Sequence, residues 1–137
     1  MTQTPHSDIL IMGAGPAGLS LALAAVRHGL SVRVIDRIAP EVLADTAFDG
    51  RASALASTSW QMLQNLGLAD RLWRDACPID RIAVSDGLRQ GSLDFDAGAD
   101  GMGVMLPNSL LRPALYDAAN ADDDIDLVMA ASVTNRA

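Results

Sequence analysis

Two short, mostly apolar runs near the N-terminus enclose a longer segment rich in Ala and Leu. The run Ile9–Met12 and the Val- and Ile-rich run 31–36 are short and mostly apolar, which predicts strands of a buried parallel sheet. Residues 16–28 between them predict a helix, which Gly29 ends in the left-handed cap position. Residues 8–36 therefore predict a β-α-β unit.

The regular alternation of strand and helix stops after this unit. The elements expected further along are an irregular connection (37–50), two helices (54–66 and 68–75), a β-hairpin (79–85 and 88–95, around Asp86-Gly87), a loop (98–103), a strand (104–106), a helix (108–119, with Asn108 or Ser109 as its cap) and a strand-like segment (126–133). This order of elements predicts an α/β fold that ends in a β-rich excursion and a return helix and strand.

A glycine pattern, Gly13-x-Gly15-x-x-Gly18, lies where the first strand passes into the helix. Gly13 permits a tight turn, and Gly15 lets the main chain approach a pyrophosphate at the helix start. Gly18 lets the helix lie close to the strand. Pro16 suits the first helical turn, and Ala17 beside it completes the candidate binding segment. This pattern favours nucleotide binding, although small residues would also serve close helix–strand packing alone.

An acidic residue, Asp36, follows the second strand of the unit. Its carboxylate is able to accept hydrogen bonds from the two ribose hydroxyls of an adenosine. A phosphate at the ribose 2′ position would meet this negative charge, which argues against NADP, while the neighbouring Arg37 weakens that argument. The strand, glycine turn, helix, strand and acid together predict a dinucleotide-binding site.

Composition and charge narrow the range of partners. Half of the 137 residues are hydrophobic, which is typical of a globular domain, and 17 acidic against 10 basic residues give a net charge of -7. No basic cluster is present in the sequence, so we expect no nucleic-acid partner. Cys77 is the single cysteine, so no intramolecular disulfide is expected.

We expect no metal site. Asp122, Asp124 and Asp126 match the first alternate ligands of a calcium loop, but Leu127 and Val133 replace its glycine and its closing glutamate.

The first eight residues lack the basic region of a secretory signal, and the apolar stretch 19–26 is shorter than a membrane span. The expected location is the cytoplasm, where an apolar patch would still permit peripheral contact with the inner membrane.

Three segments together resemble a known family: GAGPAG with its acid, DGRASALASTSWQMLQNLGLAD (49–70) and GVMLPNSLLRPALYDAA (103–119). They are similar to the N-terminal part of FAD-dependent aromatic hydroxylases, the class A flavoprotein monooxygenases, in the ubiquinone-biosynthesis hydroxylase branch. The resemblance covers nearly the whole chain. It implies a Rossmann-like FAD-binding βαβ domain over residues 1–137, with the start of a substrate-binding sheet at about 79–106 and a return helix and strand at 108–133.

The resemblance also implies roles for single residues. Gly13, Gly15 and Gly18 would hold the FAD pyrophosphate, and Asp36 would bind the adenosine ribose. Arg51 would lie near the flavin end, and Asn108 would contact the ribityl chain, with Arg112 one helical turn further on. The backbone of Val133 would contact the adenine. Arg51 suits phosphate or carbonyl oxygens because its guanidinium is planar and permanently charged. The alternatives are that Arg51 and Arg112 are solvated cations and that Asn108 only caps its helix.

The family reaction uses NAD(P)H and O2 to insert one oxygen atom into an aromatic ring. The resemblance thus implies FAD as cofactor and NAD(P)H as co-substrate. It also implies a small aromatic substrate, which in this branch is a polyprenylated phenol, and association with a ubiquinone-biosynthesis complex. No catalytic base is identified in the sequence. Two other functions remain open: an NAD-dependent dehydrogenase, and a nucleotide-binding fragment without turnover.

The family's later half, with its Gly-Asp motif and most of the substrate sheet, is missing from these 137 residues. We therefore expect the chain by itself to bind FAD weakly or not at all, to show no hydroxylase activity and to associate with other copies, because its apolar strands lack neighbours. Analytical ultracentrifugation with flavin detection tests this expectation. A monodisperse, cooperatively unfolding monomer that holds stoichiometric FAD would contradict it.

Overall fold

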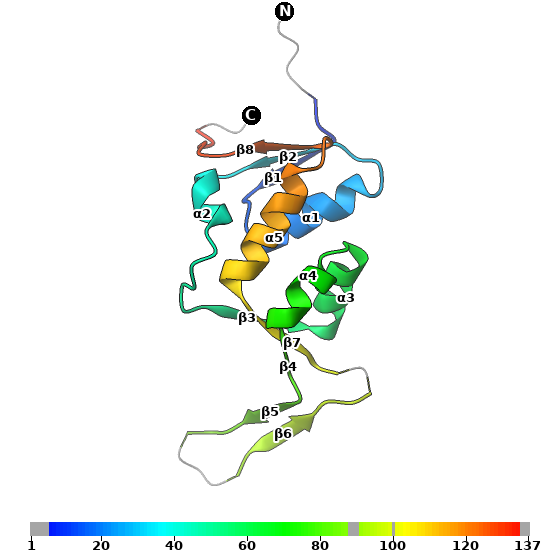
Figure 1. Ribbon diagram of the computed structural model, residues 1–137, viewed down its shortest axis with the longest axis vertical. Coiled ribbons are helices and arrows are strands. Elements are labelled where there is room, and N and C mark those ends of the chain that lie inside the picture. Colours follow the sequence, from blue (N-terminus) through cyan, green and yellow to red (C-terminus); the bar gives the residue numbers. More distant parts are fainter. Residues whose placement is uncertain (1–5, 88–90, 100, 135–137) are drawn as a thin grey trace, which may run out of the picture. The chain divides into compact units, whose positions relative to one another are not determined.

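The structure is a computed structural model, which describes residues 6–87, 91–99 and 101–134. The chain forms two compact units, one made of Met1–Asp49 with Ser109–Ala137 and the other of Gly50–Asn108, and each is described by itself. The first unit holds a parallel sheet in the order β1-β2-β8 (Figure 1). Its strands are β1 (Ile9–Met12), β2 (Val32–Ile35) and β8 (Ile125–Val128).

The helix α1 (Pro16–Val26) connects β1 to β2, as the apolar pattern predicts. Pro16 stands in its first turn, where the missing N–H leaves no helical bond unmade. Gly29, just after the helix, has a φ of +76°, which is the expected left-handed conformation. The β-α-β unit is thus confirmed, with the helix ending two residues earlier than expected.

The two faces of the parallel sheet differ in burial. Ile11 and Val34 pair across β1 and β2 and are buried on the side where α1 and α5 (Asn108–Asn120) lie (Figure 1). On the opposite face, Leu10 and Met12 are 59% and 53% exposed. Both helices lie on one side of the sheet, so the other face of the described strands is exposed.

The start of this sheet is fastened by a side chain. The Asp8 carboxylate accepts hydrogen bonds from the Ser31 backbone N–H (2.8 Å) and hydroxyl (2.7 Å). These bonds hold the pKa of Asp8 below its ordinary value, because they favour the charged form. The interaction joins the residue before β1 to the residue before β2.

The second unit is built on an antiparallel sheet in the order β3-β7-β4. Its elements are β3 (Ala52–Ala56), α3 (Ser57–Asn65), α4 (Ala69–Leu72), the 3-10 helix η1 (Trp73–Asp75), β4 (Cys77–Pro78) and β7 (Gly103–Pro107). Leu63 and Leu72 of the helices and Val104 and Leu106 of β7 are buried, which gives this unit an apolar core of its own.

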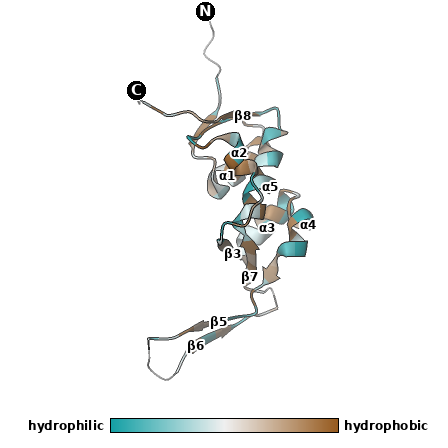
Figure 2. Cartoon of the chain, turned by 60° about the vertical axis from the view of Figure 1, so that its left-hand side comes forward, coloured by the Kyte–Doolittle hydropathy of each residue, from teal (hydrophilic) through white to brown (hydrophobic). Residues whose placement is uncertain are grey.

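A separate two-stranded ribbon follows β4 along the chain. It consists of β5 (Arg81–Val84) and β6 (Leu93–Asp96); hydrophobic and hydrophilic residues alternate along β6, whereas three hydrophobic residues follow Arg81 in β5 (Figure 2). Ile82 pairs with Phe95, so these side chains share one face, whereas Arg81 forms an ion pair with Asp94 on the other. All residues of both strands are exposed.

Several expected boundaries are wrong. Residues 37–50 contain a short helix, α2 (Pro40–Ala44), residues 52–56 form a strand instead of starting a helix, and the last strand ends at Val128. The hairpin turn is longer than Asp86-Gly87, because Val84 pairs with Leu93. Part of the strand expected at 88–95, namely residues 88–90, lies outside the described residues.

Gly103 is required by the β3–β7 pairing. Its φ is +131°, and a Cβ built there would lie 1.9 Å from the carbonyl oxygen of Leu55. We therefore expect Gly103→Ala to lower the free energy of unfolding by about 1–3 kcal/mol, through backbone strain and steric overlap. Chemical denaturation measures this change.

The matched control is Gly98→Ala, since a Cβ at Gly98 meets no atom within 4 Å. This control should change stability by less than about 0.5 kcal/mol. Equal stability of the Gly103→Ala and Gly98→Ala proteins would show that Gly103 is not conformationally required.

Candidate functional site

The glycine turn between β1 and α1 leaves backbone surface uncovered. Gly13 has a φ of +117°, and its N–H donates to the carbonyl oxygen of Ile35 (2.8 Å). A Cβ built on Gly15 would meet no atom within 4 Å, and no side chain caps the start of α1. The first N–H groups of the helix therefore lack a side-chain partner and lie beside open space, as an anion site requires.

The three glycines of the pattern have different roles. A Cβ on Gly18 would lie 2.0 Å from the carbonyl oxygen of Gly13 and 3.3 Å from the Ile11 side chain. Gly18 is therefore needed for close packing of α1 on β1. No such contact explains Gly13 or Gly15, so close packing alone does not account for the whole pattern.

Asp36 links the end of β2 to the glycine turn. One carboxylate oxygen accepts a hydrogen bond from the Ala14 N–H (2.6 Å), and the other accepts one from the Ile38 N–H (2.8 Å). A carboxylate offers about four lone-pair directions, so both oxygens retain acceptor capacity. This structural role was not expected from the sequence, where Asp36 was interpreted as a ribose acceptor alone.

A pocket of about 470 Å³ lies at this end of the parallel sheet. It brings together four residues expected from the sequence, namely Gly13, Asp36, Arg37 and Val133. Sequence reasoning missed the remaining lining residues, which are Met12, Ile35, Ala131 and Ser132. Met12 and Ile35 are strand ends that line this pocket instead of a core, and no pattern in the sequence distinguishes these two positions of an apolar residue.

The segment after β8 reaches this pocket through a left-handed residue. Ala130 has a φ of +54°, which is uncommon for a residue with a Cβ. Its N–H donates to the carbonyl oxygen of Ile38 (3.1 Å), and the Ala131 N–H donates to that of Asp36 (3.0 Å). These bonds hold the segment beside Asp36, so that Ala131, Ser132 and Val133 line the pocket.

Arg112 lies on α5 and forms an ion pair with Asp49 over 3.4 Å. The Arg112 side chain is only 18% exposed. Its Nε atom is buried and has no hydrogen-bond partner within the described part of the chain. Because an unpaired buried donor is costly, Arg112 is not the solvated cation that the sequence left open as an alternative.

Arg51 and Asn108 belong to the other unit. The Asn108 N–H donates to the carbonyl oxygen of Arg51 (3.0 Å), and the Ser53 hydroxyl donates to the Asn108 side-chain oxygen (2.6 Å). Asn108 is the first residue of α5, as expected, and its amide oxygen is already used by Ser53. The structure thus joins Arg51 and Asn108 to each other, and separately joins the glycine turn to Asp36.

Other site types find little support in the structure. Over the described ranges, no group of three or more His, Cys, Asp or Glu side chains could hold a metal ion. Nor does any helix within them have the length and apolar character needed to cross a bilayer. Cys77 is exposed and does not line the pocket beside the glycine turn.

The fold and the glycine site are typical of a dinucleotide-binding domain, and comparison with known proteins gives its family. The sequence profile of the FAD binding domain family matches residues 6–136, so the chain belongs to this family. The family and the antiparallel sheet of residues 50–108 both argue against a plain NAD-dependent dehydrogenase, in which strands and helices would continue to alternate.

Among curated proteins, the chain is similar to ubiquinone hydroxylases. It is 34% identical to ubiquinone hydroxylase UbiM of Neisseria meningitidis (90% of this chain, 28% of the relative). It is 42% identical to UbiL of Rhodospirillum rubrum (80% and 26%) and 33% identical to 3-demethoxyubiquinol 3-hydroxylase of Escherichia coli (93% and 33%). The chain therefore spans about a quarter to a third of the length of these relatives, which confirms the resemblance to this branch.

Solved structures show the same fold. PqsL of Pseudomonas aeruginosa, described as a probable FAD-dependent monooxygenase, superposes with a TM-score of 0.72 at 20% identity, over 92% of this chain and 33% of PqsL. The flavin-dependent monooxygenase PieE, solved with FAD and substrate, gives a TM-score of 0.66 at 26% identity (94% and 24%). The expected Rossmann-like fold of FAD-dependent monooxygenases is confirmed.

Removal of the Asp36 carboxylate tests its part in the site. Asp36→Ala removes acceptors for ribose hydroxyls and also leaves the Ala14 N–H without its partner. The lost hydrogen bonds correspond to about 1.5–3 kcal/mol of binding free energy, so we expect the FAD affinity of the full-length gene product to fall roughly ten- to a hundredfold. A fluorescence titration with FAD measures this change. Glu41→Ala, which removes an exposed acid in α2, is the control and should leave affinity unchanged. Unaltered affinity in Asp36→Ala would remove Asp36 from the site.

Proposed function

We propose that the chain is the FAD-binding portion of a monooxygenase that uses NAD(P)H and O2 to hydroxylate an aromatic substrate, a polyprenylated phenol of ubiquinone biosynthesis. The observation that carries this proposal is the pocket shared by the glycine turn and Asp36, beside an uncapped helix start. The names of the relatives, which are ubiquinone hydroxylases, support the substrate class.

The residues of the first unit fit the adenosine and pyrophosphate parts of FAD. The open space at Gly15 would accept the pyrophosphate against the first N–H groups of α1, with Pro16 and Ala17 in the same turn. Asp36 would accept from the ribose hydroxyls with its remaining lone pairs. The backbone near Val133, which lines the same pocket, would border the adenine.

Arg112 would contact an oxygen of the cofactor. Its buried Nε lacks a partner among the described residues, while one of its terminal nitrogens is paired with Asp49. A phosphate or carbonyl oxygen of FAD would satisfy this donor. The pairing with Asp49 would hold the guanidinium in place for that contact.

Arg51 and Asn108 would hold the ribityl and flavin end. Because the Asn108 side-chain oxygen accepts from Ser53, its NH₂ group faces away from that bond and is able to donate to a ribityl hydroxyl. Arg51 is exposed and adjoins Asn108 through its carbonyl group. Its guanidinium would balance negative charge on the flavin ring system.

Bound FAD supplies the redox chemistry, in which electrons from the nicotinamide co-substrate are used to activate O2. The residues described above bind and orient the cofactor, and none of them is assigned as a catalytic acid or base. Turnover by the whole protein would require parts that the relatives carry beyond the region matched here. Since a prenylated phenol resides in lipid, the proposal includes a cytoplasmic protein that contacts the inner membrane peripherally, in a ubiquinone-biosynthesis complex.

Gly15→Val tests the cofactor assignment. A branched side chain would fill the space in front of the helix start and block backbone approach to a pyrophosphate, so we expect the purified full-length gene product to lose its bound FAD. The absorption spectrum of the oxidised flavin measures this loss. Gly98→Val is the control and should retain FAD, because Gly98 has open space and belongs to neither FAD contact group.

The same spectra discriminate between the functions. Normal FAD in the Gly15→Val protein would contradict the assignment. Nicotinamide binding without flavin in the unaltered protein would indicate a dehydrogenase, and binding of neither would indicate a fragment without redox function.

A further inference from the structure

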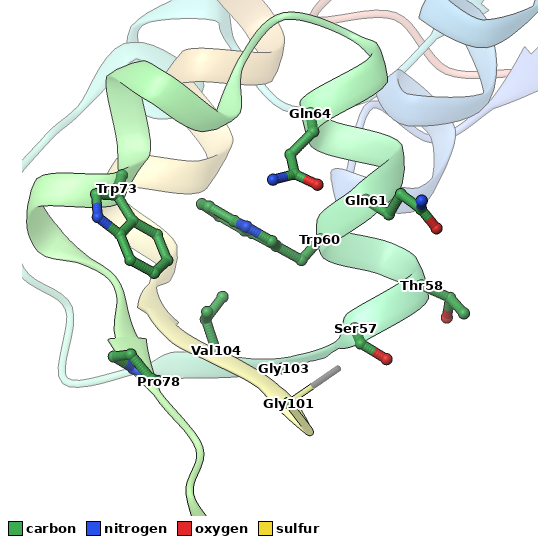
Figure 3. Close-up of a pocket in the computed structure, with 10 residues that line it drawn as sticks. All are labelled: Ser57, Thr58, Trp60, Gln61, Gln64, Trp73, Pro78, Gly101, Gly103 and Val104. Atoms are coloured by element: carbon green, nitrogen blue, oxygen red, sulfur yellow. The ribbon is translucent and has the colours of Figure 1, made fainter. Parts of the chain in front are cut away.

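We propose that a second pocket, in the unit Gly50–Asn108, binds an uncharged planar aromatic ring that carries a hydroxyl or carbonyl oxygen at its edge (Figure 3). The pocket has a volume of about 560 Å³, which lies within the usual range for small-molecule sites. This inference goes beyond the proposed function, because it requires neither FAD nor the glycine turn.

Two tryptophans form the aromatic wall of this pocket. Trp60 projects from α3 and Trp73 begins η1, and their ring centroids are 5.7 Å apart at an interplanar angle of 45°. Trp73 is 53% exposed, although its side chain is large and mostly apolar. A planar ligand that stacks on these rings would remove this surface from water and gain offset or edge-to-face contacts.

The rest of the lining combines apolar and polar residues: Pro78, Val104 and two glycines on one hand, and Ser57, Thr58, Gln61 and Gln64 on the other. Figure 3 shows Val104 below the Trp60 ring and the Gln64 amide above it, while Pro78 lies below Trp73 and Ser57 lies at the start of α3. No hydrogen bond within the described part of the chain uses the Gln64 or Ser57 side chain. An amide and a hydroxyl both donate and accept, so they suit an oxygen substituent on a ring.

The charge of the lining selects a neutral ligand. Among the described residues that line the pocket, none is charged, and the chain as a whole carries a net charge of -7, which disfavours an anion. A smaller hollow of about 310 Å³ adjoins the same two tryptophans and contains Asp70. A cationic ligand would bind over the indole faces in that hollow instead. The charge of the ligand therefore distinguishes the two binding sites in an experiment.

The sequence allows a direct test, because Trp60 and Trp73 are the only tryptophans in the chain. The 137-residue protein is labelled with nitrogen-15, and naphthol, naphthoate and naphthylmethylammonium are titrated in turn while the two indole N–H signals are followed by NMR. We expect saturable shifts of both signals with naphthol, and at least roughly tenfold weaker binding of the two charged analogues. If the protein associates, saturation-transfer signals of the ligands give the same comparison.

Variants locate the binding. Trp73→Ala should weaken naphthol binding roughly three- to tenfold or more, whereas Trp73→Phe, which retains a ring, should stay within about threefold. Phe48→Ala, which removes an exposed aromatic ring from the other unit, is the control and should have no effect. A parallel FAD titration of the same samples reports on the proposed function independently.

Four outcomes would overturn the inference. The first is the absence of saturable naphthol binding, and the second is binding that Trp73→Ala leaves unchanged. The third is preference for the ammonium analogue, which would assign the tryptophans to a cation site beside Asp70. A collapsed spectrum, typical of an unfolded chain, would likewise overturn it, because the pocket exists only in the folded unit.

Discussion

The close contact between α1 and the end of β1 is the constraint on which the nucleotide pocket depends. Gly18 allows this contact, since a Cβ there would overlap the carbonyl oxygen of Gly13. The contact directs the start of α1 toward the end of the sheet, and Asp36 then fastens β2 to the same turn through the Ala14 N–H. Uncovered backbone donors and an acceptor side chain thus meet at one end of the sheet, as recognition of a dinucleotide requires.

Asp36 has two roles in the structure, and a single substitution of this residue removes both of them. Its carboxylate organises the turn through two backbone hydrogen bonds, and it lines the pocket where a ribose would bind. The segment after β8 relies on the same residue, because the Ala131 N–H donates to the Asp36 carbonyl oxygen. Ala130, in the same segment, has a left-handed conformation, which is strained for a residue with a Cβ. Strained residues of this kind are often found at binding sites.

The sequence was sufficient to predict elements whose conformation is determined locally. The β-α-β unit was confirmed because short apolar strands, a glycine turn and a glycine cap each carry a distinct local pattern. The strand Ala52–Ala56 was missed, because its exposed small residues read as the start of the helix that follows, and only pairing with β7 makes it a strand. The Arg112–Asp49 ion pair and the pocket beside Trp60 also arise from contacts between distant residues, which a single sequence does not encode in a readable pattern.

We propose that the glycine turn and Asp36 form a flavin-nucleotide site and not a nicotinamide site. Equilibrium dialysis of the full-length gene product against FAD, with and without a large excess of NAD⁺, tests this claim most directly. The account predicts one FAD bound per chain, which excess NAD⁺ does not displace. Absence of bound flavin, or its replacement by NAD⁺, would contradict the claim.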